Sequence, residues 1–260
     1  MSNKMPNAPV LYALGLVRFS PIEKMTTFYA DFQESLRLTG LTEFSALEQM
    51  NVQVTFEKES VNTSRSSEPL WIYSNIERTE GYLLSKDFLC FHTTSYETHE
   101  PFLDKLISGL KLLDSVASIR NVIRLGLRYI DVAIPSSNES NEIYLYEGFN
   151  KIPNFGKSLM TTTEAFLELE TRPVIPKGKM IARVHSVHGQ PLGLPNDLSL
   201  HGLVLLPKFV KSNQPTNFVM LDVDHSVEGP MSLESIQLRD RKSTRLNSSH
   251  LDLSRMPSSA

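Results

Sequence analysis

The chain has 260 residues, with 26 Lys and Arg against 29 Asp and Glu, and a formal net charge of −3 at pH 7. This length is enough for one large domain or two small lobes around a sizeable core. The single cysteine, Cys90, excludes an intrachain disulfide and a metal cluster built on cysteines. It lies in an apolar run, so we interpret it as a buried structural thiol.

The last 21 residues, 240–260, resemble the conceptual translation of a sequencing-library adapter. We therefore exclude them from the fold and expect them to project without a packed core. On this interpretation the native sequence is legible only as far as Arg239. Residues 1–239 hold 22 basic and 27 acidic side chains, a net charge of −5. This balance disfavours nonspecific binding to nucleic acid or to an anionic membrane.

The first part of the chain predicts a strand followed by a helix. Residues 10–19 are apolar, and Ser20-Pro21-Ile22-Glu23 has the pattern of an N-cap, an N1 proline and a capping-box glutamate. Apolar side chains then recur at helical spacing until Gly40, which we expect to end the helix. Alternation at residues 52–56 predicts a half-buried strand, and residues 57–69 are expected to form a polar loop.

Further along, two strands are expected at residues 70–76 and 81–94, a strong amphipathic helix near residues 102–117, and a long strand at 122–134. The Ser/Asn-rich stretch 135–141 would separate an N-terminal α+β lobe (1–135) from a strand-rich lobe (142–239). Strands are expected there at residues 161–171, 179–188 and 217–227. The predicted fold class is α+β, with antiparallel sheet lobes and two amphipathic helices packed on one face.

Three segments resemble a sporadically distributed family of uncharacterised bacterial and archaeal proteins: PNAPV at residues 6–10, RLGLRYID at 124–131 and LDVD at 221–224. The Gly-Leu-Arg-Tyr-Ile core at residues 126–130 is the most specific part. Because the family is uncharacterised, the resemblance supplies no activity and no catalytic residues for this chain. Members of the family usually end in a helical segment with a nearby aromatic residue, so the resemblance implies that this chain is truncated at Arg239.

Charged residues fall at alternate positions of several expected strands. They are Arg124 and Arg128; Glu164, Glu168 and Glu170; Arg183 and His185; and Asp222 and Asp224. If these strands are neighbours, one sheet face carries mixed charge. One interpretation is a solvent-facing set of cross-strand ion pairs. The other is a binding face for a polar or anionic partner, formed by Arg124, Arg128, Arg183 and His185.

Asp222 and Asp224 also allow a metal hypothesis, because alternate residues of a strand share a side and Mg²⁺ prefers oxygen ligands. A structural role for the two acids is the competing interpretation. The sequence has no phosphate loop, dinucleotide-binding fingerprint, nucleophile elbow or zinc-protease motif.

We therefore predict a cytoplasmic, noncatalytic binding or regulatory module without a cofactor, whose partner is a protein or polar ligand rather than nucleic acid or a membrane. The alternative is a metal-dependent hydrolase or nuclease that uses Asp222 and Asp224.

Overall fold

The computed structural model describes residues 8–57, 60–136, 138–145, 159–169, 178–210 and 215–231, and within the strands it gives only the backbone of residues 51–57, 60–66 and 169. The expected adapter-derived tail, residues 240–260, lies outside the described residues. So does Glu170, one of the charged residues singled out in the sequence.

One antiparallel sheet of nine strands organises the described residues, in the order β2-β3-β4-β5-β1-β6-β9-β8-β7. The strands are β1 (Val10–Phe19), β2 (Glu43–Glu57), β3 (Ser60–Ser74), β4 (Glu80–Leu84), β5 (Phe88–Thr93), β6 (Val122–Ala133), β7 (Met160–Leu169), β8 (Gly178–Gln190) and β9 (Thr216–Met231). Together with two helices, this sheet confirms the predicted α+β class.

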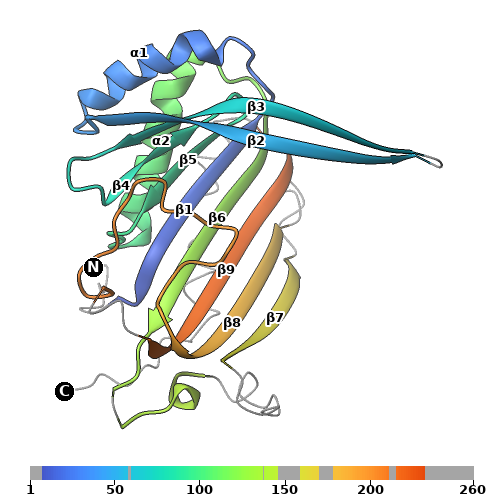
Figure 1. Cartoon of the computed structure of the whole chain (residues 1–260). Helices are drawn as coiled ribbons and strands as arrows, with labels where there is room; N and C mark the ends of the chain where they lie inside the picture. The colour runs from blue at the N-terminus through green and yellow to red at the C-terminus, as the bar shows by residue number, and fades with distance from the viewer. Residues whose placement is uncertain are drawn as a thin grey trace.

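The two α-helices, α1 (Met25–Arg37) and α2 (His99–Ala117), pack on the same face of the sheet (Figure 1). The face of α2 that carries Phe102, Leu106 and Leu113 is buried, as its helical spacing predicts. The main core lies between these helices and strands β1, β3, β4, β5 and β6. The prediction of two helices on one face is therefore confirmed.

At its C-terminal end α1 is terminated by Gly40, as the sequence predicts. Gly40 has φ +94°, its N–H donates to Arg37 O (3.1 Å), and Leu41 N–H donates to Leu36 O (3.2 Å). This pair of bonds is a Schellman motif, which requires a left-handed residue that glycine adopts without steric cost.

The predicted start of α1 at Ser20 is wrong. The helix begins at Met25, and its N-cap residue Lys24 makes no side-chain cap. Ser20 N–H donates instead to Asn121 O, and the Asn121 side-chain amide donates to Ser20 Oγ at 3.0 Å. A tertiary contact thus takes the hydroxyl that the local pattern assigned to the helix.

Two further expectations along the chain are wrong. Residues 60–69 belong to β3, which pairs with β2 as a long hairpin, so the segment expected as a polar loop is a strand. The segment expected as one strand at residues 81–94 is the hairpin of β4 and β5, turning at Ser85, whose N–H donates to Phe88 O. Burial on both faces makes these residues continuously apolar, so alternation gives no sign of the turn.

The face opposite the helices is partly covered by residues 191–210, the connection between β8 and β9, which we call the strap. It crosses the sheet in front of β1 and β6 (Figure 1). Under it lies a second apolar cluster with Tyr12, Ile130 and Phe218 from the sheet and Leu203 and Phe209 from the strap. We call this side of the sheet the strap face.

The two expected lobes contribute to one sheet, because β6 pairs with β9 from Val122↔Met231 to Ala133↔Val219. The expected boundary at residues 135–141 falls in the connection after β6. There the short 3-10 helix Asn141–Tyr144 brings the buried Asn141 amide to Ser186 Oγ, Val187 O and Phe218 O. These three hydrogen bonds fix the connection to the end of β8 and β9.

Candidate functional site

Antiparallel register brings charged side chains from four strands onto the strap face. Glu164 of β7 lies opposite Arg183 of β8, and Arg183 lies opposite Asp222 of β9. Arg128 of β6 lies opposite Asp224, one step along from Asp222. Residues directly opposite in a sheet share a face, so these side chains form one row across β6, β9, β8 and β7.

Arg128 is the centre of this row. Its Nε and Nη2 donate to the two carboxylate oxygens of Asp222, both at 2.8 Å. Its Nη1 and Nη2 also donate to Asp197 of the strap, at 2.6 and 3.1 Å. These two bidentate carboxylate pairs engage four of the five N–H donors of the guanidinium, and they join the sheet to the strap.

Arg183 continues the row toward the β7 edge. Its Nε donates to Glu164 at 2.5 Å, and its Nη1 lies 3.4 Å from Asp222 Oδ2. We call Glu164, Arg183, Asp222, Arg128 and Asp197 the charge row. Asp222 is its buried hub, since its carboxylate is fully inaccessible and bonded by both arginines.

The charge row has cations inside and carboxylates outside. The Asp197 and Glu164 side chains are 64% and 52% exposed, against 9% for Arg128 and 27% for Arg183. Burial alone lowers the pKa of Arg128, but the hydrogen bonds that it donates to Asp222 and Asp197 outweigh burial and raise the pKa. The bond from Arg128 lowers the pKa of Asp197. Exposed carboxylates therefore form both ends of the row, and its cations lie between them.

The other residues expected at this face lie around the charge row. Arg124 is further along β6, opposite Arg18 on one side and Glu228 on the other. His185 is opposite Thr162, whose Oγ1 lies 2.9 Å from its Nδ1, and burial lowers the pKa of His185. The structure thus unites Arg128 and Arg183 through Asp222, whereas Arg124 and His185 have other neighbours.

Asp222 and Asp224 share the strap face, as their spacing predicts. Both oxygens of Asp222 accept hydrogen bonds from Arg128, so a cation there would have to displace a guanidinium. Within the described ranges, no group of three or more His, Cys, Asp and Glu side chains is arranged to hold a metal ion.

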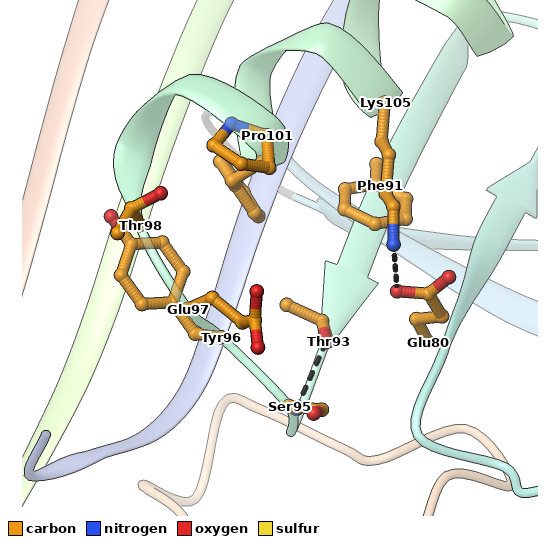
Figure 2. Close-up of a pocket in the computed structure, with 10 residues that line it drawn as sticks. Glu80, Phe91, Thr93, Ser95, Tyr96, Glu97, Thr98, Pro101 and Lys105 are labelled. Carbon is orange, nitrogen blue, oxygen red and sulfur yellow. Dashed lines mark hydrogen bonds and ion pairs between the residues drawn. The ribbon is translucent and has the colours of Figure 1, made fainter. Parts of the chain in front are cut away.

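Sequence reasoning missed a small pocket on the helix face, with a volume of about 150 Å³, beside the start of α2 (Figure 2). Glu80 and Lys105 form an ion pair at one side (2.5 Å), and the carboxylate of Glu97 lies between Tyr96 and Thr93. Its lining comes from β4, β5, the segment before α2 and the first turns of α2 itself. No sequence pattern indicates it, because only tertiary packing brings these segments together.

A buried histidine under the strap was also missed. His92 is fully inaccessible, and a hydrogen bond of 2.9 Å joins its Nδ1 to the hydroxyl of Tyr12. Burial, and then the nearby His201, lower the pKa of His92 to about 3. His92 is therefore neutral in the folded protein, and it packs with Tyr12 in an edge-on arrangement. Cys90, two residues earlier, is buried as expected, and burial raises its pKa to about 12.

No protein family model and no curated protein sequence matches this chain. Among the described residues, neither helix combines the length and apolar character needed to cross a membrane. The functional argument therefore depends on the geometry of the strap face.

Proposed function

We propose that this protein is a noncatalytic cytoplasmic binding module, and that the strap face binds a cationic protein segment. The observation that carries the proposal is the order of charge in the row: the two arginines are engaged inside, and the carboxylates of Glu164 and Asp197 are outside. This changes the expected chemistry of the partner. Arginines that already hold carboxylates have few donors left for an anionic ligand, whereas exposed carboxylates attract Lys and Arg side chains.

The net charge of the wider strap face is negative, like that of the exposed ends of the charge row. On β6 to β9 and the strap, the described charged side chains are the acids Glu164, Glu168, Asp197, Asp222, Asp224 and Glu228 of this face against the bases Arg124, Arg128, Lys179, Arg183 and Lys208. Acids outnumber bases by one, and this sign agrees with the net charge of the chain. A face of this kind accelerates encounter with a basic partner and repels an acidic one.

The competing hypothesis, a metal-dependent hydrolase or nuclease using Asp222 and Asp224, requires Asp222 to leave both arginines. Breaking a buried ion pair without replacing the partner costs about 3–5 kcal/mol. Calorimetric titration with Mg²⁺ or Mn²⁺ separates the hypotheses: heat that is lost in Asp224→Asn would favour the metal site, and its absence agrees with the binding module.

Cytoplasmic location is part of the proposal because the only thiol is buried and unpaired, which suits a reducing compartment and needs no disulfide framework. We also propose that residues 240–260 derive from an adapter and that residues 126–130 place the chain in the family they resemble. Resequencing the 3′ end of the coding region tests the adapter origin, and a genomic sequence that encodes residues 240–260 unchanged would contradict it.

The binding proposal is tested with an unstructured eight-residue peptide of alternating lysine and serine, measured at low salt against its glutamate–serine counterpart. Carbodiimide cross-linking should join peptide lysines to Glu164 and Asp197. The double variant Glu164→Gln/Asp197→Asn removes two exposed ion pairs of up to about 1 kcal/mol each, so the peptide should bind roughly 5- to 30-fold more weakly.

The matched control is Glu34→Gln, an exposed carboxylate on α1 away from the strap face. It should leave peptide binding unchanged. If the double variant binds the lysine peptide as tightly as the original protein, the strap face is not the binding surface and the proposal fails.

A further inference from the structure

The outer strand β2 has an open edge. It is the first strand in the sheet order, and in the described part of the chain its 15 residues pair with β3 alone. Beyond Leu70 toward the turn, β3 in turn has only β2 as its neighbour, because β4 pairs with Trp71–Ser74. The hairpin therefore continues past the sheet as a two-stranded ribbon (Figure 1). Isolated two-stranded ribbons have marginal stability, so a third strand would stabilise this one.

One proline shows which residues of β2 direct their backbone N–H and C=O groups toward the open edge. Pro69 of β3 lies opposite Glu48 of β2 and has no N–H to donate. The pair cannot be of the hydrogen-bonded type, in which both residues exchange N–H···O bonds. The N–H and C=O of Glu48 therefore point away from β3, toward the open edge. Because the two kinds of pair alternate, Phe44, Ala46 and Met50 present their backbone groups in the same direction.

Apolar side chains at this edge are exposed on both faces of the sheet. Met50 is 73% and Leu47 is 51% exposed, and successive residues of a strand point to opposite faces. Phe44, on the same face as Met50, is also exposed although it stacks on Tyr29. A strand added here would bury apolar surface on both of its own faces, in addition to forming backbone hydrogen bonds.

Charge selects the kind of strand that fits. β2 has three acids, Glu43, Glu48 and Glu57, and no Lys or Arg. The opposite edge strand, β7, has Glu164 and Glu168 and likewise no basic residue. Any edge-to-edge contact between two copies of this chain would bring acids together, and like charges in opposed positions destabilise a sheet. A second copy therefore fits poorly at β2, whereas a basic strand fits well.

We propose that the open edge of β2 binds an extended, basic segment of another protein, which adds a tenth strand to the sheet. The segment pairs with the outward backbone groups of residues 44–50 and places Lys or Arg near Glu43 and Glu48. This site is separate from the charge row, and the inference does not depend on the function proposed for the strap face.

The probe is the synthetic peptide Val-Lys-Thr-Val-Lys-Val-Thr-Lys, capped at both ends, which places lysine on both faces of an extended strand. Hydrogen exchange of the whole protein is measured with and without it. The amides of Phe44, Ala46, Glu48 and Met50 should exchange at least tenfold more slowly when the peptide is bound. A peptide with glutamate in place of lysine should give no protection, and one with proline in place of both central valines should give little.

Two variants locate the site. Met50→Pro removes one outward N–H without removing a bond to β3, and it should abolish protection at this edge. Glu48→Lys reverses one charge and should weaken peptide binding about two- to fivefold. Glu34→Lys makes the same charge change on α1 and should have no effect.

Unchanged exchange at residues 44–50 overturns the inference, as does equal protection by the glutamate peptide. Protection that appears without peptide and grows with protein concentration would identify a second copy as the occupant and would also overturn it. The variant Glu164→Gln/Asp197→Asn should retain the protection at β2. If it does, and the lysine–serine peptide also fails to reach the strap face, the proposed function fails while the β2 site stands.

Discussion

Replacing Arg128 with methionine tests whether the charge row holds the centre of the sheet together. Methionine occupies a similar volume but removes the cation, so the fully buried Asp222 carboxylate loses both 2.8 Å bonds. Of its described partners, Arg183 remains at 3.4 Å, a long and poorly placed donor. Removing one member of a buried ion pair costs about 3–5 kcal/mol, because the other charge stays buried without compensation.

The contacts of Arg128 do not contribute equally to this loss of stability. The pair with Asp197 is nearly as short, but the Asp197 side chain is 64% exposed and its charge is well hydrated when the bond is lost. Asp197→Asn should therefore lower the free energy of unfolding by no more than about 1 kcal/mol. Its main effect should be faster hydrogen exchange in the strap, which the bond ties to β6.

Urea unfolding followed by circular dichroism measures these differences, and thermal unfolding should show a decrease in Tm of roughly 6–20 °C for Arg128→Met. Arg37→Met, which breaks an exposed pair on α1, is the control and should change stability by less than about 0.5 kcal/mol. The double variant Arg128→Met/Asp222→Leu should recover most of the loss. If Arg128→Met alone lies within about 1 kcal/mol of the original protein, Asp222 is not the buried hub inferred here.

Three other substitutions have expected outcomes. Gly109→Ala should destabilise the protein by about 1–3 kcal/mol in urea unfolding, despite the better helix propensity of alanine, because the new Cβ would clash with the ring of Tyr82. The Tyr82 hydroxyl bond to Lys105 O keeps that ring in place; a gain in stability would show that it moves. Asn141→Ala should cost about 1–3 kcal/mol in the same assay through three lost hydrogen bonds, and no loss would mean that water replaces the amide. The folded pKa of His92, about 3, is below its unfolded value near 6.5, so the unfolded chain gains a proton first and stability falls as pH decreases from 6.5 toward 3. His92→Gln should make that decline shallower in unfolding measured across this range, and an unchanged slope would contradict the assignment.

Elements whose pattern is local could be predicted from the sequence. The helical spacing of α2 places its buried face correctly, since that face contacts the core. Gly40 ends α1 because the left-handed turn depends on that residue itself. Elements that depend on distant partners were predicted less well: Ser20 bonds to Asn121 instead of starting the helix, and residues 60–69 become a strand because β2 pairs with them.

The candidate site shows the same division. The sequence by itself determined which side chains of each strand share a face, because the period of a strand is fixed by its backbone, and this placed Arg128 with Arg124 and Asp222 with Asp224. Only the tertiary structure decided the register between strands and the path of the strap. Arg128 and Asp222 are separated by 94 positions in the chain, and Arg128 and Asp197 by 69. These residues meet because β9 pairs beside β6 and because the strap crosses the sheet. As a result the arginines are covered, and the face presents the negative charge of the acids to solvent.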